Sequence, residues 1–290
     1  MHDDDGKRFT GPSDLHLHSV CSDGTEPPAD VMASAHRHGL RTVSLTDHDT
    51  TAGWAEAAEA ATSLGMTLLP GMEFSAQHEW RSVHMLSYLF DPEHPALRAE
   101  TERIRDDRIG RAERMVNSIG RDYDLTWDDV LAQTTADATV GRPHIADALV
   151  ARGLAADRSA AFDGLLHPRR GYYEPHYAPD PFRVVDLVTA AGGVVIMAHP
   201  ASGRGVLPSS LLRDLIDAGL AGFEIGHREN TEEGKRLLRR LVAESDLIVT
   251  GSSDYHGRGK PNVPGENTTS DEMVERIIER ATGTAPVYPS

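Results

Sequence analysis

The chain places histidine and carboxylate side chains at the ends of successive apolar runs. Residues 14–19 read DLHLHS, and residues 253–256, near the other end of the chain, read SDYH. Similar positions between them hold Asp23, His48, Glu73, His84 and His199. Such groups cost a protein core several kcal/mol each unless a partner binds them. The pattern therefore predicts that these side chains gather at one site and share a bound partner.

Between the clusters, patterns typical of strands alternate with patterns typical of helices, which predicts successive βαβ units. Seven segments have a strand pattern: 14–18, 42–46, 67–69, 83–89, 193–198, 222–225 and 247–252. Nearly every cluster follows one of these segments. In a parallel α/β barrel the carboxyl ends of all strands lie on one face, where active sites form. We therefore expect an α/β barrel that brings His16 and His256 together.

The alternation stops between residues 95 and 178, where the patterns are helical. Helices are expected over 97–119, 128–133, 144–152 and 158–166. We therefore predict a helical insertion or cap at 95–178 and a barrel domain made of residues 1–94 and 179–290. Seven arginines lie between Arg98 and Arg121. They form either a phosphate-binding face or a solvated helix with ion pairs such as Asp107 with Arg111.

The candidate ligands for a metal are all imidazoles and carboxylates. Nine side chains qualify: His16, His18, Asp23, His48, Glu73, His84, His199, Asp254 and His256. The alternation of a strand points both imidazoles of His16-Leu17-His18 to the same side. A structural zinc site takes four ligands, so nine indicate two or three divalent ions with a bridging carboxylate. Manganese, iron or zinc suits these donors better than magnesium or calcium.

Composition narrows the partners and the compartment. The formal net charge of −16 disfavours binding to long nucleic acid, whose affinity depends on lysine and arginine, but it allows a small phosphorylated substrate. Cys21 is the single cysteine, so no intrachain disulfide can form. The acidic start of the chain lacks the apolar core of a signal peptide, and no apolar run approaches the roughly 18 residues of a membrane helix. We expect a cytoplasmic protein without a membrane partner, and the sequence predicts no oligomeric state.

The motifs, in this order, resemble those of the PHP (polymerase and histidinol phosphatase) superfamily. The matching segments span nearly the whole chain: 16–18, 22–24, 46–49, 71–73, His84, 198–200 and 253–256. The resemblance implies a distorted (β/α)7 barrel with a trinuclear metal centre. In such a centre Glu73 would bridge two ions, of which the first also binds His16, His18 and Asp254, and the second His84 and His199. The third ion would bind Asp23, His48 and His256.

Three features resemble the small-nucleotide phosphoesterase branch of that superfamily: the long insertion, the segment GRPH at 141–144 and the segment GENTT at 265–269. Members of this branch hydrolyse phosphomonoesters of small nucleotides, such as AMP or 3′,5′-bisphosphonucleotides. The reaction proceeds by attack of a metal-bridging hydroxide on phosphorus. Glu73 and Asp254 would then be catalytic residues.

Three further residues are candidates for contacts with the substrate. Arg142 and His144 are expected to bind phosphate, because Pro143 suits the first turn of a helix and helix N-termini attract anions. His227 follows the strand predicted at 222–225. It either donates a proton to the leaving group, binds phosphate, or is an ordinary loop histidine.

Other activities fit the same residues. Related members of the superfamily trim RNA ends as 5′–3′ exonucleases, and others hydrolyse histidinol phosphate. An amidohydrolase-type C–N hydrolase also uses two histidines of this spacing on a barrel. It often needs a carbamylated lysine, and no lysine lies at a predicted strand end here. A non-enzymatic metal-binding or nucleotide-sensing module would have lost ligands, whereas the set in this chain is complete.

Overall fold

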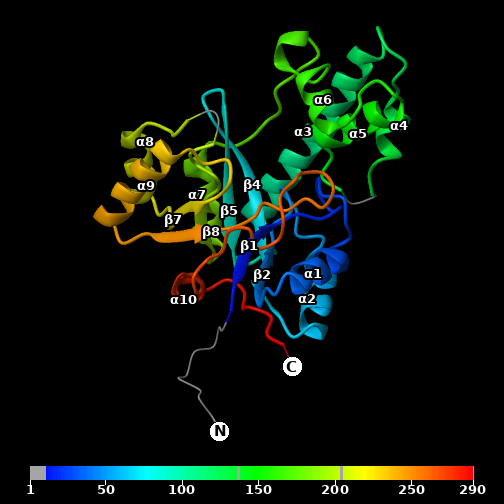
Figure 1. The fold of residues 1–290 in the computed structure, drawn as a ribbon. Coiled ribbons are helices and arrows are strands. Elements are labelled where there is room, and N and C mark those ends of the chain that lie inside the picture. Colours follow the sequence, from blue (N-terminus) through cyan, green and yellow to red (C-terminus); the bar gives the residue numbers. More distant parts are fainter. Residues whose placement is uncertain (1–10, 136–137, 203–204, 290) are drawn as a thin grey trace.

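The computed structural model describes residues 11–135, 138–202 and 205–289 of the chain (Figure 1). Their strands form two sheets, one of three strands in the order β1-β2-β3 and one of five strands in the order β4-β5-β6-β7-β8. Helices flank the sheets, and a group of helices lies to one side of them. The α/β class expected from the sequence is therefore confirmed.

The first sheet is parallel. It contains β1 (Ser13–Leu17), β2 (Thr42–Leu45) and β3 (Thr67–Leu68), connected by helices α1 (Pro28–Arg37) and α2 (Trp54–Ser63). All three strands are buried along their length, as expected where helices cover a parallel sheet. Because the strands are parallel, the segments that follow β1 and β2 both start at the same edge of this sheet.

The second sheet begins with an antiparallel hairpin that the sequence patterns did not predict. Its strands are β4 (Gly71–His78) and β5 (Arg81–Tyr88), and β5 also pairs antiparallel with β6 (Val194–Met197). The two residues between β4 and β5 make the tight turn, with Glu79 at φ 53°. We expected Glu73 just after a single strand at 67–69, but it lies within β4. Pro70, which has no N–H for a ladder, separates β3 from β4 and gives eight strands instead of seven.

The remaining strands of this sheet are parallel. They are β6, β7 (Gly222–Gly226) and β8 (Ile248–Gly251). The helices near them are α7 (Pro181–Ala190), α8 (Ser209–Asp217), α9 (Glu232–Glu244) and α10 (Asp271–Arg280). This half of the molecule has the βαβ units that the sequence predicts.

Isolated bridges connect the two sheets. Leu17 pairs with Tyr255, and His48 pairs with Glu73. Within the residues that the structure describes, the strands do not close into a single hydrogen-bonded barrel, so the expected (β/α)7 barrel is not found. The bridges nevertheless bring the segment after β8 next to the end of β1, and the segment after β2 next to β4.

The segment between β5 and α7 is helical. It contains α3 (Pro95–Ile119), α4 (Trp127–Leu131), α5 (Arg142–Ala151), α6 (Arg158–Asp163) and a short 3-10 helix, η1 (Pro168–Arg170). These helices share an apolar cluster of their own, which includes Met115, Leu149 and Leu166. The division into a barrel domain and a cap at 95–178 stays a prediction, with residues 1–10 outside the described part. None of the helices in the described part is both long and apolar enough to span a bilayer.

Candidate metal centre

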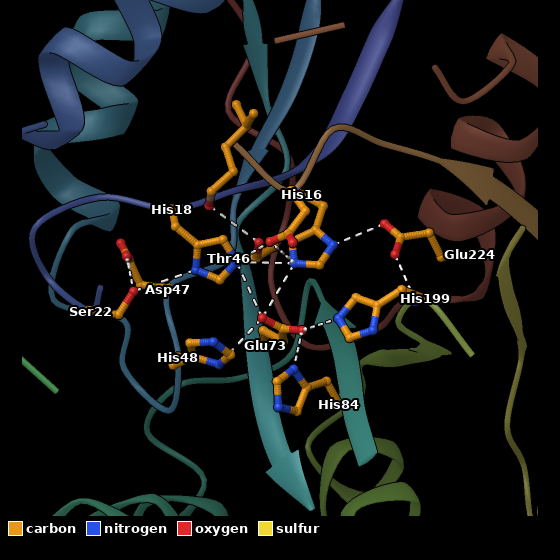
Figure 2. Close-up of polar contacts among 12 residues, drawn as sticks. His16, His18, Ser22, Thr46, Asp47, His48, Glu73, His84, His199 and Glu224 are labelled. Carbon is orange, nitrogen blue, oxygen red and sulfur yellow. Dashed lines mark hydrogen bonds and ion pairs between the residues drawn. The ribbon is translucent and has the colours of Figure 1, made fainter. Parts of the chain in front are cut away.

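Glu73 lies at the centre of the gathered side chains (Figure 2). Its Oε1 is 2.9 Å from His84 Nδ1 and 3.3 Å from His199 Nε2. Its Oε2 lies 3.2 to 3.3 Å from nitrogens of His16, His18 and His48. Glu73 and His84 share a face of the β4–β5 hairpin, because Glu73 pairs with Leu86 and positions two apart point the same way. Each oxygen of this buried carboxylate thus faces a different set of imidazoles.

Asp254 completes a second grouping around the start of the chain. Its Oδ1 is 3.4 Å from Nε2 of His16 and from Nε2 of His18, and those two nitrogens are 3.0 Å apart. His16, His18, Glu73 and Asp254 form one set with converging ligand atoms. Asp254 and His199 both have positive φ, 56° and 28°, a conformation that non-glycine residues adopt at some cost. The fold holds both residues in this backbone conformation.

A third grouping surrounds Asp23. Its Oδ1 is 3.0 Å from His256 Nε2 and 3.7 Å from His18 Nδ1, and its Oδ2 is 3.9 Å from His48 Nε2. His18, Asp23, His48 and His256 form this set, and His48, Glu73 and His84 form another. The structure therefore brings all nine predicted ligands together. His18 and His48 each take part in two sets, which the sequence reasoning did not anticipate.

Glu224 positions His16 and His199, and the sequence analysis did not identify it as a residue of the site. It is fully buried in β7 (Figure 2). Its Oε1 accepts a hydrogen bond from His16 Nδ1 at 2.9 Å, and its Oε2 accepts one from the His199 backbone N–H at 2.8 Å. The bond to Nδ1 fixes the ring so that Nε2 faces the cluster, which is the usual role of such a partner. An acidic residue in the middle of an apolar strand, GFEIG, was the available signal.

Two further aspartates hold the loops that carry the ligands. Asp47 accepts hydrogen bonds from the Ser19 backbone N–H, the Ser19 hydroxyl and the Ser22 hydroxyl, at 2.6 to 2.8 Å. Asp49 accepts from the backbone N–H and hydroxyl of Ser75, at 2.8 and 2.7 Å. These contacts tie the loop after β1 to β2, and the loop after β2 to β4.

The charges in the cluster favour ionised carboxylates. Burial by itself would raise the pKa of Glu73, but the imidazoles of His48, His84 and His16 hold that pKa well below its usual value. The pKa of Asp23 is likewise held well below its usual value, despite burial, by His256 and His48. A carboxylate must be deprotonated to bind a metal, so both side chains are in the required state.

The donor set fits divalent metal ions. His48 Nδ1 and His256 Nε2 are buried and face the carboxylates of Glu73 and Asp23, at 3.3 and 3.0 Å, but neither contact has the geometry of a hydrogen bond. A metal ion between nitrogen and carboxylate would satisfy both groups. Imidazole and carboxylate donors without thiolate are typical of zinc, manganese and iron sites.

The predicted substrate-contacting residues have different surroundings. Arg142 is the first residue of α5 and lines two cavities that reach the cluster. His144, in the first turn of α5 as expected, is 3% exposed, and its Nδ1 accepts the backbone N–H of Gly141 at 3.1 Å. His227 is fully buried behind Asp254, with its Nε2 3.6 Å from Asp254 Oδ2. A direct contact between His227 and a substrate, one of our expectations, does not fit this position.

The sequence analysis also did not identify Lys260 as a residue of the site. Its Nζ is 2.7 Å from Asp254 Oδ2, so a lysine does reach the cluster although none lies at a strand end. No sequence pattern indicates this contact, because Lys260 lies in an irregular loop after β8.

Two cavities meet at the cluster and share Ser82, His84 and Arg142. The larger has a volume of about 550 Å³ and extends beneath the cap helices. Its lining combines metal-ligand candidates, cationic side chains and aromatic rings: Asp23, His48, His84, His256, Lys260, Arg108, Arg111, Arg142, Arg158, Phe162 and Tyr173. The smaller, of about 380 Å³, adds Met197, His199, Pro200 and Leu207. The site can therefore place an anionic ligand between the metal ligands and cationic side chains.

The α/β fold and the histidine-carboxylate cluster define the class of a metal-dependent hydrolase. The family model for the PHP domain matches residues 14–137. The chain belongs to the PHP family, and its enzyme class is that of a metal-dependent phosphoric ester hydrolase.

Similar proteins cover most of the chain. A solved structure from Bifidobacterium adolescentis, assigned by its name to the metal-dependent phosphoesterases, has a TM-score of 0.91 and 44% identity, over 93% of this chain and 96% of that one. A 5′-3′ exoribonuclease from Haemophilus influenzae is 31% identical over 86% of this chain and 91% of its own length. A 3′,5′-nucleoside bisphosphate phosphatase from Chromobacterium violaceum is 31% identical over 85% and 88%.

Proposed function

We propose that this chain hydrolyses phosphomonoesters of small nucleotides, either AMP or 3′,5′-bisphosphonucleotides. The observation that carries this proposal is the cavity of about 550 Å³, which is lined both by candidate metal ligands and by arginine and aromatic side chains. That volume is within the range of small-molecule sites, which suits a nucleotide. The bisphosphate phosphatase among its relatives supports the same substrate class.

Two or three manganese, iron or zinc ions would supply Lewis acidity and a water of lowered pKa. Glu73 would hold two of these ions, and this is supported by its two oxygens, which face different imidazoles. His16, His18 and Asp254 would complete one ion site, and His84 and His199 the next. Asp23, His48 and His256 would hold a third ion, with His18 adjoining it.

The protein's own residues orient the substrate. Arg142 lies where the two cavities meet, and its guanidinium can bind a phosphate through two hydrogen bonds. His144 fixes the start of α5 and so positions Arg142, which is the role we now assign to it. His227 lies against Asp254 and would hold that carboxylate in place.

Trimming of RNA 5′ ends is the second candidate. The smaller cavity, on the far side of His84 and Arg142, offers room for a group on the other side of the phosphorus. The exoribonuclease relative supports this reading, while the net charge of −16 favours short substrates over long nucleic acid. A cytoplasmic location stays a prediction.

Histidinol phosphate hydrolysis and C–N hydrolysis are less well supported. The arginines and aromatic rings at the cap end of the cavity suit a larger, more anionic substrate than histidinol phosphate. A carbamylated lysine is not needed as a bridge, because Glu73 already faces both groups of imidazoles. Lys260 instead forms an ion pair with Asp254.

Phosphate release by the Mn²⁺-reconstituted protein tests the proposal. The substrates are AMP, adenosine 3′,5′-bisphosphate, histidinol phosphate and a short 5′-phosphorylated RNA, each with and without chelator. Chelator-sensitive turnover of a mononucleotide supports the proposed function, and preference for the RNA selects the second candidate. Silence with all four substrates, while metal is bound, would contradict both and favour C–N hydrolysis or a sensing role.

A further inference from the structure

Asp254 has a backbone conformation that is costly for a residue with a side chain. Its φ of 56° lies in the left-handed region, which aspartate tolerates better than most residues but still at some cost. The φ and ψ angles of a residue are set by the orientations of the two peptide planes beside its Cα. The direction of the Asp254 carboxylate toward His16 and His18 therefore depends on what holds these two planes.

Side chains hold both peptide planes beside Asp254. On one side, the Ser253 carbonyl accepts a hydrogen bond from Asn262 Nδ2 at 2.6 Å. On the other side, the Asp254 carbonyl accepts a hydrogen bond from His256 Nδ1 at 2.8 Å. His256 is one of the nine candidate ligands, so its contact belongs to the metal centre itself. Asn262 is not a candidate ligand, and its bond to the Ser253 carbonyl acts on the centre from outside.

Asn262 is itself fixed within its loop. It is 5% exposed, and its Oδ1 accepts a hydrogen bond from Arg228 Nη1 at 3.3 Å. Arg228 in turn forms an ion pair with Glu266, at 3.0 Å. Glu266 Oε2 also accepts the Val263 backbone N–H at 3.2 Å, so the loop is closed on itself. These contacts restrict the rotation of the Asn262 amide away from the Ser253 carbonyl.

Asp14 fastens the same loop to β1. Its Oδ2 accepts the Gly265 backbone N–H at 2.8 Å, and its Oδ1 accepts the Ser253 backbone N–H at 3.1 Å. Gly265 has a φ of 77°, a conformation that favours glycine. The segment GENTT at 265–269 thus begins with a residue that connects this loop to Asp14. We call residues 260–266 the clamp loop.

We propose that the clamp loop sets the backbone conformation of Asp254, with Asn262 as the positioning residue for this metal ligand. The inference rests on the proposed function, in which Asp254 completes an ion site with His16 and His18. Within the loop, Lys260 contacts the Asp254 carboxylate at 2.7 Å, and Asn262 contacts the peptide plane before Asp254. Asn262 is outside the described lining of both cavities, so it acts on a substrate only through Asp254. Outer contacts of this kind hold a ligand in the geometry that a metal requires.

The test compares Asn262→Ala with Val263→Ala, a matched control at an exposed position of the same loop. Binding of Mn²⁺ to the chelator-treated protein is measured in a calorimeter. Asn262→Ala should weaken the binding of one ion about 10 to 100-fold, as expected when a ligand loses an outer contact, and Val263→Ala should leave every affinity unchanged. Equal affinities in the two variants overturn the proposal. The measurement needs no turnover, so it stands even if no nucleotide is hydrolysed.

Asn262→Asp separates the hydrogen bond from packing. Aspartate keeps the shape and the oxygen that faces Arg228, but an ionised carboxylate has no N–H for the Ser253 carbonyl. This variant should therefore bind Mn²⁺ no more tightly than Asn262→Ala. Wild-type affinity in Asn262→Asp would overturn the proposal, because the donor would then not be needed.

Kinetics separate positioning from a general loss of structure. If Asn262→Ala lowers the fraction of protein in which Asp254 can bind metal, the apparent affinity falls by that fraction, and excess Mn²⁺ recovers the competent state. Saturating Mn²⁺ should therefore restore most of kcat, with KM for AMP unchanged, whereas a kcat that stays low or a raised KM contradicts positioning. If circular dichroism shows that Asn262→Ala does not fold, Arg228→Met takes its place. It frees the Asn262 amide and should weaken Mn²⁺ binding by less, and an unchanged affinity counts against the proposal.

Discussion

Glu73 is the residue on which the proposed chemistry most depends, because its two oxygens are directed at different histidines. Replacing it with Gln removes the charge and one acceptor oxygen while keeping the shape. We expect Glu73→Gln to lower the rate of phosphate release at least about 100-fold. Replacing even a residue that only hydrogen-bonds to a metal ligand typically lowers activity or metal affinity about 10 to 100-fold. Phosphate release and metal content are measured together, with Glu59→Gln, on the exposed side of α2, as the control. A normal rate with a full complement of metal would contradict the bridging role.

His176 links stability to pH at the cap end of the cavity. Burial and then the charge of Arg108 lower the pKa of His176 to about 3, and its Nδ1–H donates to the Tyr177 carbonyl at 2.7 Å. The unfolded chain takes up a proton on this ring below about pH 6.5, and the folded protein does not, so the free energy of unfolding falls as the pH drops from 6.5 towards 3.

The corresponding prediction concerns His176→Gln, which cannot take up this proton. Between pH 7.5 and pH 5 the wild type should lose about 2 kcal/mol more of its unfolding free energy than this variant. Urea unfolding at the two pH values measures the difference. Parallel losses in the two proteins would show that His176 is protonated equally in the folded and unfolded states.

The cap helices contact the metal ligands through Arg158, the first residue of α6. Its Nε and Nη2 each donate to Asp147 of α5 at 2.6 Å, and its Nη1 donates to the backbone oxygen of Asp23 at 3.0 Å. The loop that carries Asp23 is thus fastened to two helices of the cap. A ligand held by its own outer contacts loses less freedom when a metal binds.

We therefore expect Arg158→Ala to weaken metal binding at the Asp23 group about 10 to 100-fold, so that dialysed protein retains about one ion less than wild type. Elemental analysis of the dialysed proteins gives the count. Arg152→Ala is the control, because Arg152 pairs with Asp124 and Asp129 on the cap itself. Equal metal contents in the two variants would mean that the cap does not support this site.

The predicted helices and the seven predicted strands are found close to their expected positions, and β4 is the strand that was missed. The expected helix at 97–119 is found at 95–119, and the helix expected to begin at His144 begins at Arg142. Proline at the first turn and the 3.6-residue period are local signals, so they can be read without knowing the fold. The strand predicted at 83–89 is found as β5, whereas β4 and its antiparallel pairing were missed, because the polar Glu73 interrupts the apolar pattern that marks a strand.

In the molecule as a whole, the candidate centre lies where the two sheets meet. The nine candidate ligands come from both sheets and their loops, so a bound metal would add to the bridges and the apolar contacts that already join the sheets. Bound metal would therefore stabilise the folded state, since the unfolded chain does not hold these ligands together.

Metal removal tests this role. A chelator should lower the midpoint of thermal unfolding by about 5 to 10 °C, which corresponds to a few kcal/mol for a chain of this size, and added Mn²⁺ should restore it. In the Glu73→Gln variant, the chelator should lower the midpoint of thermal unfolding by less than in the wild type. A midpoint that chelator leaves unchanged would indicate that the sheets hold together without metal.

The linear sequence was enough to predict the class of site and its nine candidate ligands. Histidine and carboxylate residues directly after apolar runs are rare without a bound partner, and this signal is local. The tertiary structure decided what depends on contacts between distant residues. It placed Glu224 behind His16, Lys260 on Asp254 and Arg111 beside the cavity, and it buried His227 against Asp254. The physical reason is that burial and pairing of charges arise only when elements pack, and residues such as 16 and 224 give no mark of their contact along the chain.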